Sequence, residues 1–209
     1  MKLTAVALAC AAVLGSSPAA TIVENFSLGS TAADFSIYNI FVDQFDPSLG
    51  TLNSVTIGAT ASSTGGSVQF MANTAGDRTL GIGSQVTISG PVALTLNPNP
   101  FQSQEYLGLV AGDSVTLVGT TSSDSDSDSA FAPPSDLSPY IGLGSVMLTV
   151  QGVVDTLSVG SALGLTGDAP TNYSVDGTIT YTYEPSVPEP GSVLLAVFGG
   201  GLLLIRRRR

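Results

Sequence analysis

The sequence predicts an all-β protein, an antiparallel β-sandwich of the jelly-roll or immunoglobulin-like kind. Short segments between residues 21 and 184 alternate apolar with polar residues, which is the period of a strand with one buried face. Glycine, serine, asparagine and proline separate these segments roughly every 8 to 12 residues, as turns do in a sandwich. The same stretch has no helical period of about ten residues free of glycine and proline. These three observations predict about nine to eleven short strands in two packed sheets.

The first clear strand is expected at residues 35–42, because this segment is rich in β-branched and aromatic residues. Asp46 to Gly50 should then form a turn, since Pro47 already has the φ that the second turn position needs. Alternation continues through the rest of the body. The apolar residues expected on buried faces are Leu52, Val55, Ile57, Ala59, Val68, Phe70, Ala72, Val86, Ile88, Val92, Leu94, Leu96, Val115, Leu117, Val146, Leu148 and Val150.

The closing strand is expected at residues 174–184. One of its faces should carry Val175, Ile179, Tyr181 and Tyr183, and the other Thr178, Thr180 and Thr182. A single short helical turn is expected before Ile141, with Ser135 placed to cap it.

Residues 1–20 are typical of a secretory signal peptide: Lys2 gives the positive start, an apolar stretch follows, and small residues around Pro18 suit cleavage. Two alternatives are a retained N-terminal helix and a lipoprotein signal acylated at Cys10. The apolar core before Cys10 is short for a lipoprotein signal, and Ala7 stands where such signals usually have leucine. Because Cys10 is the only cysteine, we expect no disulfide in the exported protein.

Residues 185–209 form a second targeting segment with three parts. Proline and glutamate alternate at Pro188, Glu189 and Pro190, and two prolines keep this stretch extended. The apolar run 192–205 would span about 21 Å as a helix, short of the roughly 30 Å hydrocarbon core. A basic cluster then closes the chain: Arg206, Arg207, Arg208 and Arg209. This cluster should stop translocation and stay cytoplasmic, leaving the body outside.

Together, the Pro-Glu-Pro triplet, the short apolar helix and the terminal arginines resemble the PEP-CTERM sorting signal of Gram-negative bacteria. The resemblance implies recognition of Pro188, Glu189 and Pro190 by a membrane-embedded exosortase, which is thought to cut near the triplet. It also implies delivery to the cell surface or extracellular matrix. An ordinary C-terminal membrane anchor with a proline-rich stalk is the alternative, and the short apolar run disfavours it.

The body resembles the choice-of-anchor E domain. The stretches that carry this resemblance are residues 45–52, the acidic serine segment near Asp124, residues 136–144, and residues 178–183. This resemblance covers most of residues 24–184. The resemblance implies an exported bacterial protein that ends in one of several alternative sorting signals, and it implies no biochemical activity.

Charge divides sharply between the body and the targeting ends. Residues 21–184 hold 15 acidic residues against one basic residue, Arg78, a formal charge of about −14, whereas the whole chain has a net charge of −10. Nucleic-acid binding needs clustered lysine and arginine. We therefore expect no nucleic-acid partner, while cationic partners stay open.

The body also lacks the usual catalytic side chains. Residues 21–184 contain no histidine, cysteine, lysine or tryptophan, so nucleophilic systems based on Ser-His, Cys-His or Ser-Lys pairs have no base. Zinc sites built on nitrogen or sulfur are excluded in the same way. Paired carboxylates of a glycosidase remain the weakest hypothesis, because no particular pair stands out. We expect a protein that is not an enzyme.

The densest group of polar residues is the run 123–129, in which Asp124, Asp126 and Asp128 alternate with serine. Alternate carboxylates are what a calcium loop uses for its first ligands, so calcium is the one cofactor that the sequence suggests. No glycine or closing glutamate completes an EF-hand. A solvated surface loop is the favoured interpretation.

Two smaller groups have both a functional and a structural interpretation. Tyr173, Tyr181 and Tyr183 could form an aromatic platform for sugar, although core or sheet-edge packing is favoured. Asp77 and Arg78 could be a site built on the sole base of the body, although a surface ion pair is favoured.

The expected function follows from the two targeting segments and from the lack of the usual catalytic side chains in residues 21–184. We expect a non-enzymatic exported protein that passes through the inner membrane by way of residues 192–205. An exosortase then releases it to the surface of a Gram-negative bacterium, in association with exopolysaccharide or biofilm. The alternative is a carbohydrate-binding module, with or without help from calcium.

Overall fold

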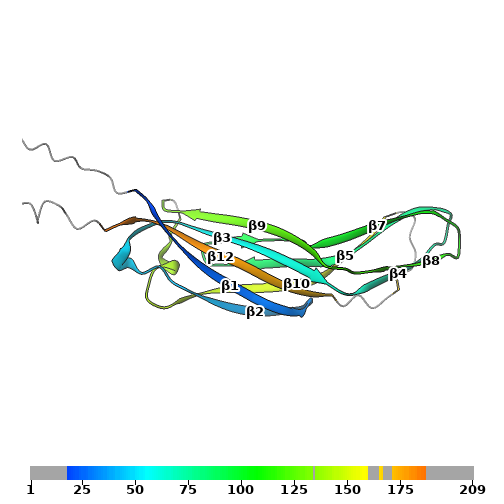
Figure 1. Ribbon diagram of the computed structural model, residues 1–209, viewed down its shortest axis with the longest axis horizontal. Coiled ribbons are helices and arrows are strands. Elements are labelled where there is room, and N and C mark those ends of the chain that lie inside the picture. The colour runs from blue at the N-terminus through cyan, green and yellow to red at the C-terminus, as the bar shows by residue number, and fades with distance from the viewer. Residues whose placement is uncertain (1–17, 134, 160–164, 167–170, 187–209) are drawn as a thin grey trace, which may run out of the picture.

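The computed structural model describes residues 18–133, 135–159, 165–166 and 171–186, and these form an elongated all-β molecule (Figure 1). Every pairing between its named strands is antiparallel. The predicted antiparallel β-sandwich is therefore confirmed. Most of the predicted signal peptide, and the predicted sorting segment from residue 187 onward, lie outside the described residues.

The first sheet has the order β1-β12-β3-β9. Its strands are β1 (Ala20–Ala32), β12 (Asn172–Pro185), β3 (Gly50–Thr64) and β9 (Ser122–Phe131). The predicted closing strand is the central β12, which pairs with β1 along one edge and with β3 along the other. The first and last strands of the domain are thus neighbours.

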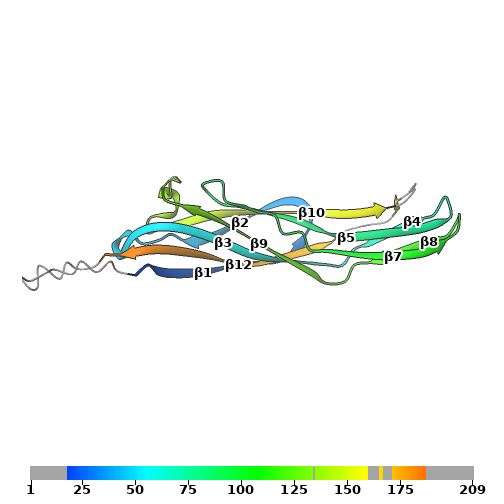
Figure 2. The ribbon, with the colours of Figure 1, turned by 90° about the horizontal axis from the view of Figure 1, so that it is seen from above.

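The second sheet lies against the first, and Figure 2 shows the two layers edge-on. It consists of β2 (Asp34–Asp43), β10 (Ser145–Val159), β5 (Gly76–Ser89), β6 (Thr95–Leu96) and β7 (Phe101–Leu109), the last two both pairing with the same edge of β5. A small third sheet has the order β11-β4-β8, formed by β11 (Leu165–Thr166), β4 (Ser67–Met71) and β8 (Ser114–Val118).

Two short 3-10 helices interrupt the strands: η1 (Pro47–Leu49) and η2 (Ser138–Tyr140). Asp46 caps η1 by accepting from the Ser48 backbone N–H at 2.8 Å, which confirms the predicted turn and lowers the pKa of Asp46. Ser135 does not cap η2, so that prediction is wrong. The helix starts at Ser138, and Asp136 accepts from its N–H at 3.0 Å instead.

The apolar alternation predicts most of the core correctly. Almost all of the predicted inward positions are buried, while Val92 and Val115 are half-buried. Leu52 is buried although it falls out of step with Val55, because a β-bulge between β3 and β12 absorbs the extra residue Asn53.

Three tyrosines lie in the centre of this core. Tyr140, Tyr173 and Tyr181 are each at most 1% exposed. The hydroxyl of Tyr181 donates to the Asp43 carbonyl at 2.8 Å, and that of Tyr140 donates to the Pro91 carbonyl at 2.9 Å. Burial raises the pKa of Tyr173 to about 12 and raises those of Tyr140 and Tyr181 as well. The predicted aromatic sugar platform is therefore wrong, and the core-packing interpretation is confirmed.

The two ends of the elongated domain differ in character. Both described chain ends lie at one end, where Ala20 of β1 pairs with Tyr183 of β12 (Figure 1). The opposite end is built from β4, β7 and β8 around a separate apolar cluster. This second cluster contains Val68, Phe70, Ala72, Leu80, Ile82 and Leu117.

A glycine in β10 tests the packing of the core. A side-chain carbon at Gly152 would overlap the ring of Tyr173, whereas one at Gly29 would meet open space. We expect Gly152→Ala to lower the free energy of unfolding by about 1–3 kcal/mol, because overpacking displaces a buried ring. Gly29→Ala should stay within about 0.5 kcal/mol of the parent protein. Urea denaturation measures both, and equal stability of the two variants would contradict this packing of Tyr173 against Gly152.

Candidate functional site

The serine and aspartate run forms a strand, so the predicted surface loop is wrong. Residues 122–131 are β9, which pairs with β3 along its whole length. Asp124, Asp126 and Asp128 pair with Ala61, Ala59 and Ile57, which are buried on the inward face of β3. Because side chains of directly paired residues share a face, the three carboxylates lie on the side of β9 that is turned toward the second sheet, at an edge where Asp124 and Asp126 remain exposed.

The three carboxylates bind the backbone of the second sheet. Each accepts a hydrogen bond through its Oδ2 atom from an alternate N–H of residues 95–99: Thr95 to Asp128 at 3.1 Å, Asn97 to Asp126 at 2.8 Å, and Asn99 to Asp124 at 2.8 Å. We call this set the aspartate ladder. It joins the edge of one sheet to the edge of the other.

The backbone of residues 94–100 explains why the ladder is needed. The carbonyls of Pro98 and Pro100 accept from Val86 and Ser84 of β5, so the even-numbered residues face that strand. The N–H groups of the odd-numbered residues 95, 97 and 99 therefore point away from β5, toward an edge that no other strand of the described residues covers. The aspartate ladder satisfies these donors, which an open edge would leave for another chain to bind.

The same geometry bears on the calcium hypothesis. The remaining carboxylate oxygens of Asp126 and Asp128 accept from the N–H groups of Ser127 and Ser129, both at 2.8 Å. Alternate residues of a strand lie roughly 6.6–6.8 Å apart, so the carboxylates follow the strand instead of converging on one point. No group of three or more His, Cys, Asp or Glu residues that could hold a metal occurs in the part of the chain described. The aspartate ladder thus does not group its carboxylates around one point, and a calcium site stays a prediction.

The outward face of the first sheet is covered with hydroxyl groups. The registers of β1, β12, β3 and β9 bring serine and threonine side chains together there, and we call this surface the hydroxyl face. Its members are Thr21, Ser27, Thr56, Thr60, Ser62, Ser123, Ser125, Ser127, Ser129, Ser174, Thr178, Thr180 and Thr182. Two cross-strand pairs, Thr56 with Ser129 and Thr60 with Ser125, hydrogen-bond at 2.8 Å.

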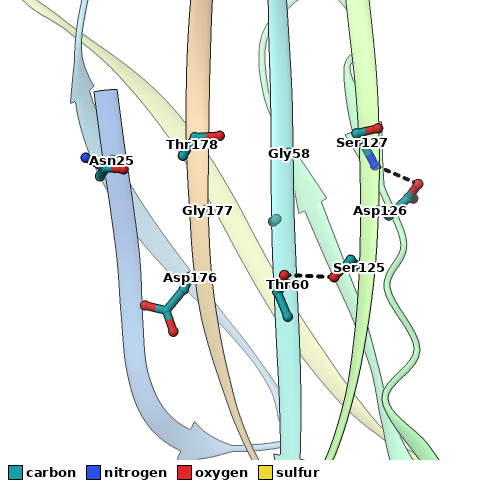
Figure 3. Close-up of a pocket in the computed structure, with 10 residues that line it drawn as sticks. Asn25, Gly58, Thr60, Ser125, Asp126, Ser127, Asp176, Gly177 and Thr178 are labelled. Atoms are coloured by element: carbon teal, nitrogen blue, oxygen red, sulfur yellow. Dashed lines mark hydrogen bonds between the residues drawn. The ribbon is translucent and has the colours of Figure 1, made fainter. Parts of the chain in front are cut away.

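A shallow hollow of about 590 Å³ lies in the middle of the hydroxyl face (Figure 3). Its lining comes from all four strands: Asn25, Gly58, Ala59, Thr60, Ser125, Asp126, Ser127, Asp176, Gly177 and Thr178. Gly58 opens the hollow, because a side-chain carbon there would fit at 3.9 Å from Ser127 and Thr178. Gly177 is needed for packing instead, because a side chain would overlap the ring of Phe26.

This arrangement provides a surface of hydrogen-bonding groups. Hydroxyls, the amide of Asn25 and the exposed carboxylate of Asp176 line the hollow. Such groups suit a neutral or cationic ligand rich in hydroxyls. The sequence predicted the polar side of β12, including Thr178. It did not indicate Asn25 or Asp176 as part of a site, because strand order cannot be read from alternation.

Arg78 occupies a different environment from the one predicted. It is only 5% exposed, so the predicted surface ion pair is wrong. Its guanidinium donates to the carbonyls of Asp77 at 2.7 Å and Thr74 at 2.9 Å, and Asp77 accepts from the N–H of Gly108 at 2.8 Å. The hydrogen bonds of Arg78 thus stabilise the turn that leads into β5. The predicted sorting residues Pro188, Glu189, Pro190 and Arg206 to Arg209 lie outside the described residues.

Substitutions in the aspartate ladder test its role. Replacing all three aspartates by alanine should speed amide hydrogen exchange at Thr95, Asn97 and Asn99 and lower the free energy of unfolding by about 0.5–1.5 kcal/mol per lost hydrogen bond. Replacement by asparagine removes the charge and keeps only one of the two oxygen acceptors that Asp126 and Asp128 use, so exchange should lie between the parental rate and that of the alanine variant. The double variant Ser123→Ala and Ser127→Ala is the control on the other face of β9.

Unchanged exchange at the three amides in the alanine variant would contradict the ladder. Repeating the unfolding measurement with calcium and with a chelator tests the calcium hypothesis separately. Stabilisation by calcium that the alanine variant loses would support a metal site.

Comparisons with known proteins do not assign a family. No protein-family model matches the chain, and no curated protein matches it. A structure of infectious bursal disease virus, Gx strain, is 12% identical with a TM-score of 0.21, over 89% of this chain and 42% of that one. A Mud crab tombus-like virus structure is 10% identical with a TM-score of 0.27, over 93% and 94%. A structure of Desmodium yellow mottle tymovirus is 8% identical with a TM-score of 0.22, over 90% of this chain and 92% of that one. The chain spans less than half the length of the first of these, and similarities this low carry no functional argument.

Proposed function

We propose that this is a non-enzymatic exported protein of a Gram-negative bacterium, delivered to the cell surface or extracellular matrix and associated there with exopolysaccharide or biofilm. An exosortase would recognise Pro188, Glu189 and Pro190 and process the chain. The tripartite pattern of residues 185–209 carries this proposal. As part of the same proposal, the sandwich is of the jelly-roll or immunoglobulin-like kind.

The way the domain holds its last described residues supports processing at the triplet. Glu184 and Pro185 still pair with Thr51 and Gly50 at the end of β12. The N–H of Ser186 donates to the Leu49 carbonyl at 3.0 Å. Only Val187 separates Ser186 from the triplet. A cut within or after the triplet therefore leaves the described hydrogen bonds of the domain in place.

The positions of the two chain ends also suit a short-lived membrane intermediate. Both targeting segments join the domain at the same end, and the tip formed by β4, β7 and β8 lies farthest from it (Figure 1). In the proposal, residues 192–205 hold this end at the inner membrane, with the arginines in the cytoplasm. Within the described ranges, no helix has the length and apolar character needed to cross a membrane.

The surface chemistry of the domain supports a polysaccharide environment over a nucleic acid. The only base of the body, Arg78, is buried, while the 15 acidic residues of residues 21–184 leave its charge strongly negative. Phosphate backbones would be repelled. The hydroxyl face instead offers neutral hydrogen-bonding groups.

Following the two ends of the chain in cells tests the sorting proposal. A C-terminal epitope tag should be lost from the exported protein in cells with an exosortase and retained in cells without one. Replacing Pro188, Glu189 and Pro190 by alanine should leave an uncut product in the inner membrane. Substituting Ser186 by alanine is the control, because it alters the neighbouring stalk and leaves the triplet intact. An uncut, permanently membrane-bound parental protein would contradict the proposal.

A second candidate function is a carbohydrate-binding module, and the hollow in the hydroxyl face favours it. Glycan-array binding by the parental protein should fall at least about tenfold in Gly58→Leu, because the new side chain occupies the hollow. Gly29→Ala, outside the hollow, should bind as the parental protein does. The array is read with calcium and with a chelator. The absence of binding in both conditions would refute this function while leaving the sorting proposal untouched.

A further inference from the structure

The strand β2 lies at the edge of the second sheet, and no other strand in the described part of the chain pairs with its outer side. It is the terminal strand of the second sheet and pairs only with β10 among the described residues. In Figure 1 it runs along the same long side of the molecule as β1, the terminal strand of the first sheet. A terminal strand presents a row of backbone donors and acceptors that another strand can bind.

The outward face of β2 carries large apolar side chains that are exposed. Phe35, Ile37 and Phe41 are 66%, 64% and 65% exposed, and Met147, which pairs with Phe41, is 46% exposed. We call these four residues the β2 patch. Exposed apolar side chains grouped along an edge usually mark a contact with another protein surface.

The other long side of the sandwich is protected, whereas the regular part of β2 is not. The aspartate ladder covers the edge N–H groups of residues 95–99. Residues 37–43 contain no lysine, arginine, proline or glycine, which are the residues that usually block pairing at an edge.

The beginning of β2 differs, because a β-bulge precedes Ile37. Phe35 there has a positive φ of 67°, held by two contacts: Asp34 accepts from the Ser36 N–H at 3.1 Å, and Gln151 donates to the Phe35 carbonyl at 2.8 Å. This bulge ends regular pairing and so limits a new partner strand to the stretch after Ser36.

We propose that a second copy of this chain pairs with β2, antiparallel and centred on Asn39. In this register Asn39 lies opposite Asn39 of the second copy. Ile37 then lies opposite Phe41 of the second copy, and the reverse pair forms by symmetry. The exposed face would contain two apolar pairs around one amide pair, and the inward face would place Tyr38 opposite Ile40.

The residue pattern selects this register over its neighbours. A shift of one residue would oppose outward with inward side chains, which places the two sheet faces in conflict. A shift of two residues would place Ile37 opposite either Asn39 or Asp43, so apolar side chains would face polar ones. Among these neighbouring registers, the one centred on Asn39 pairs like with like, and such self-complementarity is what a two-fold interface requires. A partner of different sequence would not need this symmetry.

Charge should make the association depend on salt. Each domain is strongly acidic, so two copies repel each other at low ionic strength. The β2 patch itself is uncharged, with Asp34 and Asp43 at the ends of the strand. Added salt therefore screens the repulsion and should strengthen the dimer. The pairing does not depend on the proposed sorting function.

Cysteine cross-linking in the full chain tests the register directly. In a Cys10→Ser background, Asn39→Cys should form a disulfide-linked dimer under mild oxidation, because directly opposed side chains have Cβ atoms roughly 4.5–5.5 Å apart. Thr149→Cys is the matched control: it neighbours Asn39 on β10 and lies one strand away from the two-fold axis. Equal cross-linking of both variants, or of neither, would overturn the proposal.

Sedimentation of the full chain in a nonionic detergent gives a second, independent readout. The parental protein should show a dimer whose fraction rises with salt, and Ile37→Lys should raise the dissociation constant at least about tenfold. The new lysine lowers the net negative charge, so weaker association would come from lost apolar pairing. Leu143→Lys, at a residue 86% exposed outside the patch, should leave the dimer unchanged. A monomeric parental protein at high salt, or equal effects of the two lysines, would refute the dimer.

Discussion

Hydrogen bonds between aspartate side chains and a neighbouring backbone close one long side of this sandwich. A strand shared by both sheets would satisfy every edge donor through the main chain. Here β9 belongs to one sheet and residues 94–100 to the other, and the carboxylates of the aspartate ladder connect them. This constraint explains the composition of β9. Serine is needed outward for the hydroxyl face, aspartate is needed inward for the ladder, and two residue types with low strand propensity therefore form a strand.

The parts of the fold that follow from local pattern could be predicted from the sequence, and those that depend on a distant partner could not. Val55, Ile57 and Ala59 alternate because one side of β3 is buried, and the pattern shows it directly. The sequence does not predict β9 as a strand, because its carboxylates are satisfied by Thr95 and Asn97, some thirty residues earlier in the chain. Tertiary contacts override propensity at such positions.

Glycine residues make the first half of β5 hard to recognise as a strand from the sequence. The first half of β5 contains Gly81 and Gly83, which suggest a loop when only the sequence is considered. In the structure both glycines leave room for the ring of Phe101 on the neighbouring β7. The candidate site could not be predicted from the sequence either, because its residues are far apart along the chain. Its residues Asn25, Thr60 and Asp176 come from three strands, and only the sheet order β1-β12-β3 shows that they are neighbours.

The central position of β12 has a mechanical consequence for a chain held by its C-terminus. A pull on residue 186 acts along β12, which is flanked on both sides, by β1 and by β3, over nearly its full length. Strand hydrogen bonds lie across the pulling direction, so many of them must break together before the strand can slide. A peripheral strand pulled from its end would instead peel away one bond at a time. The domain is thus arranged to resist shear at the point where a tether would load it.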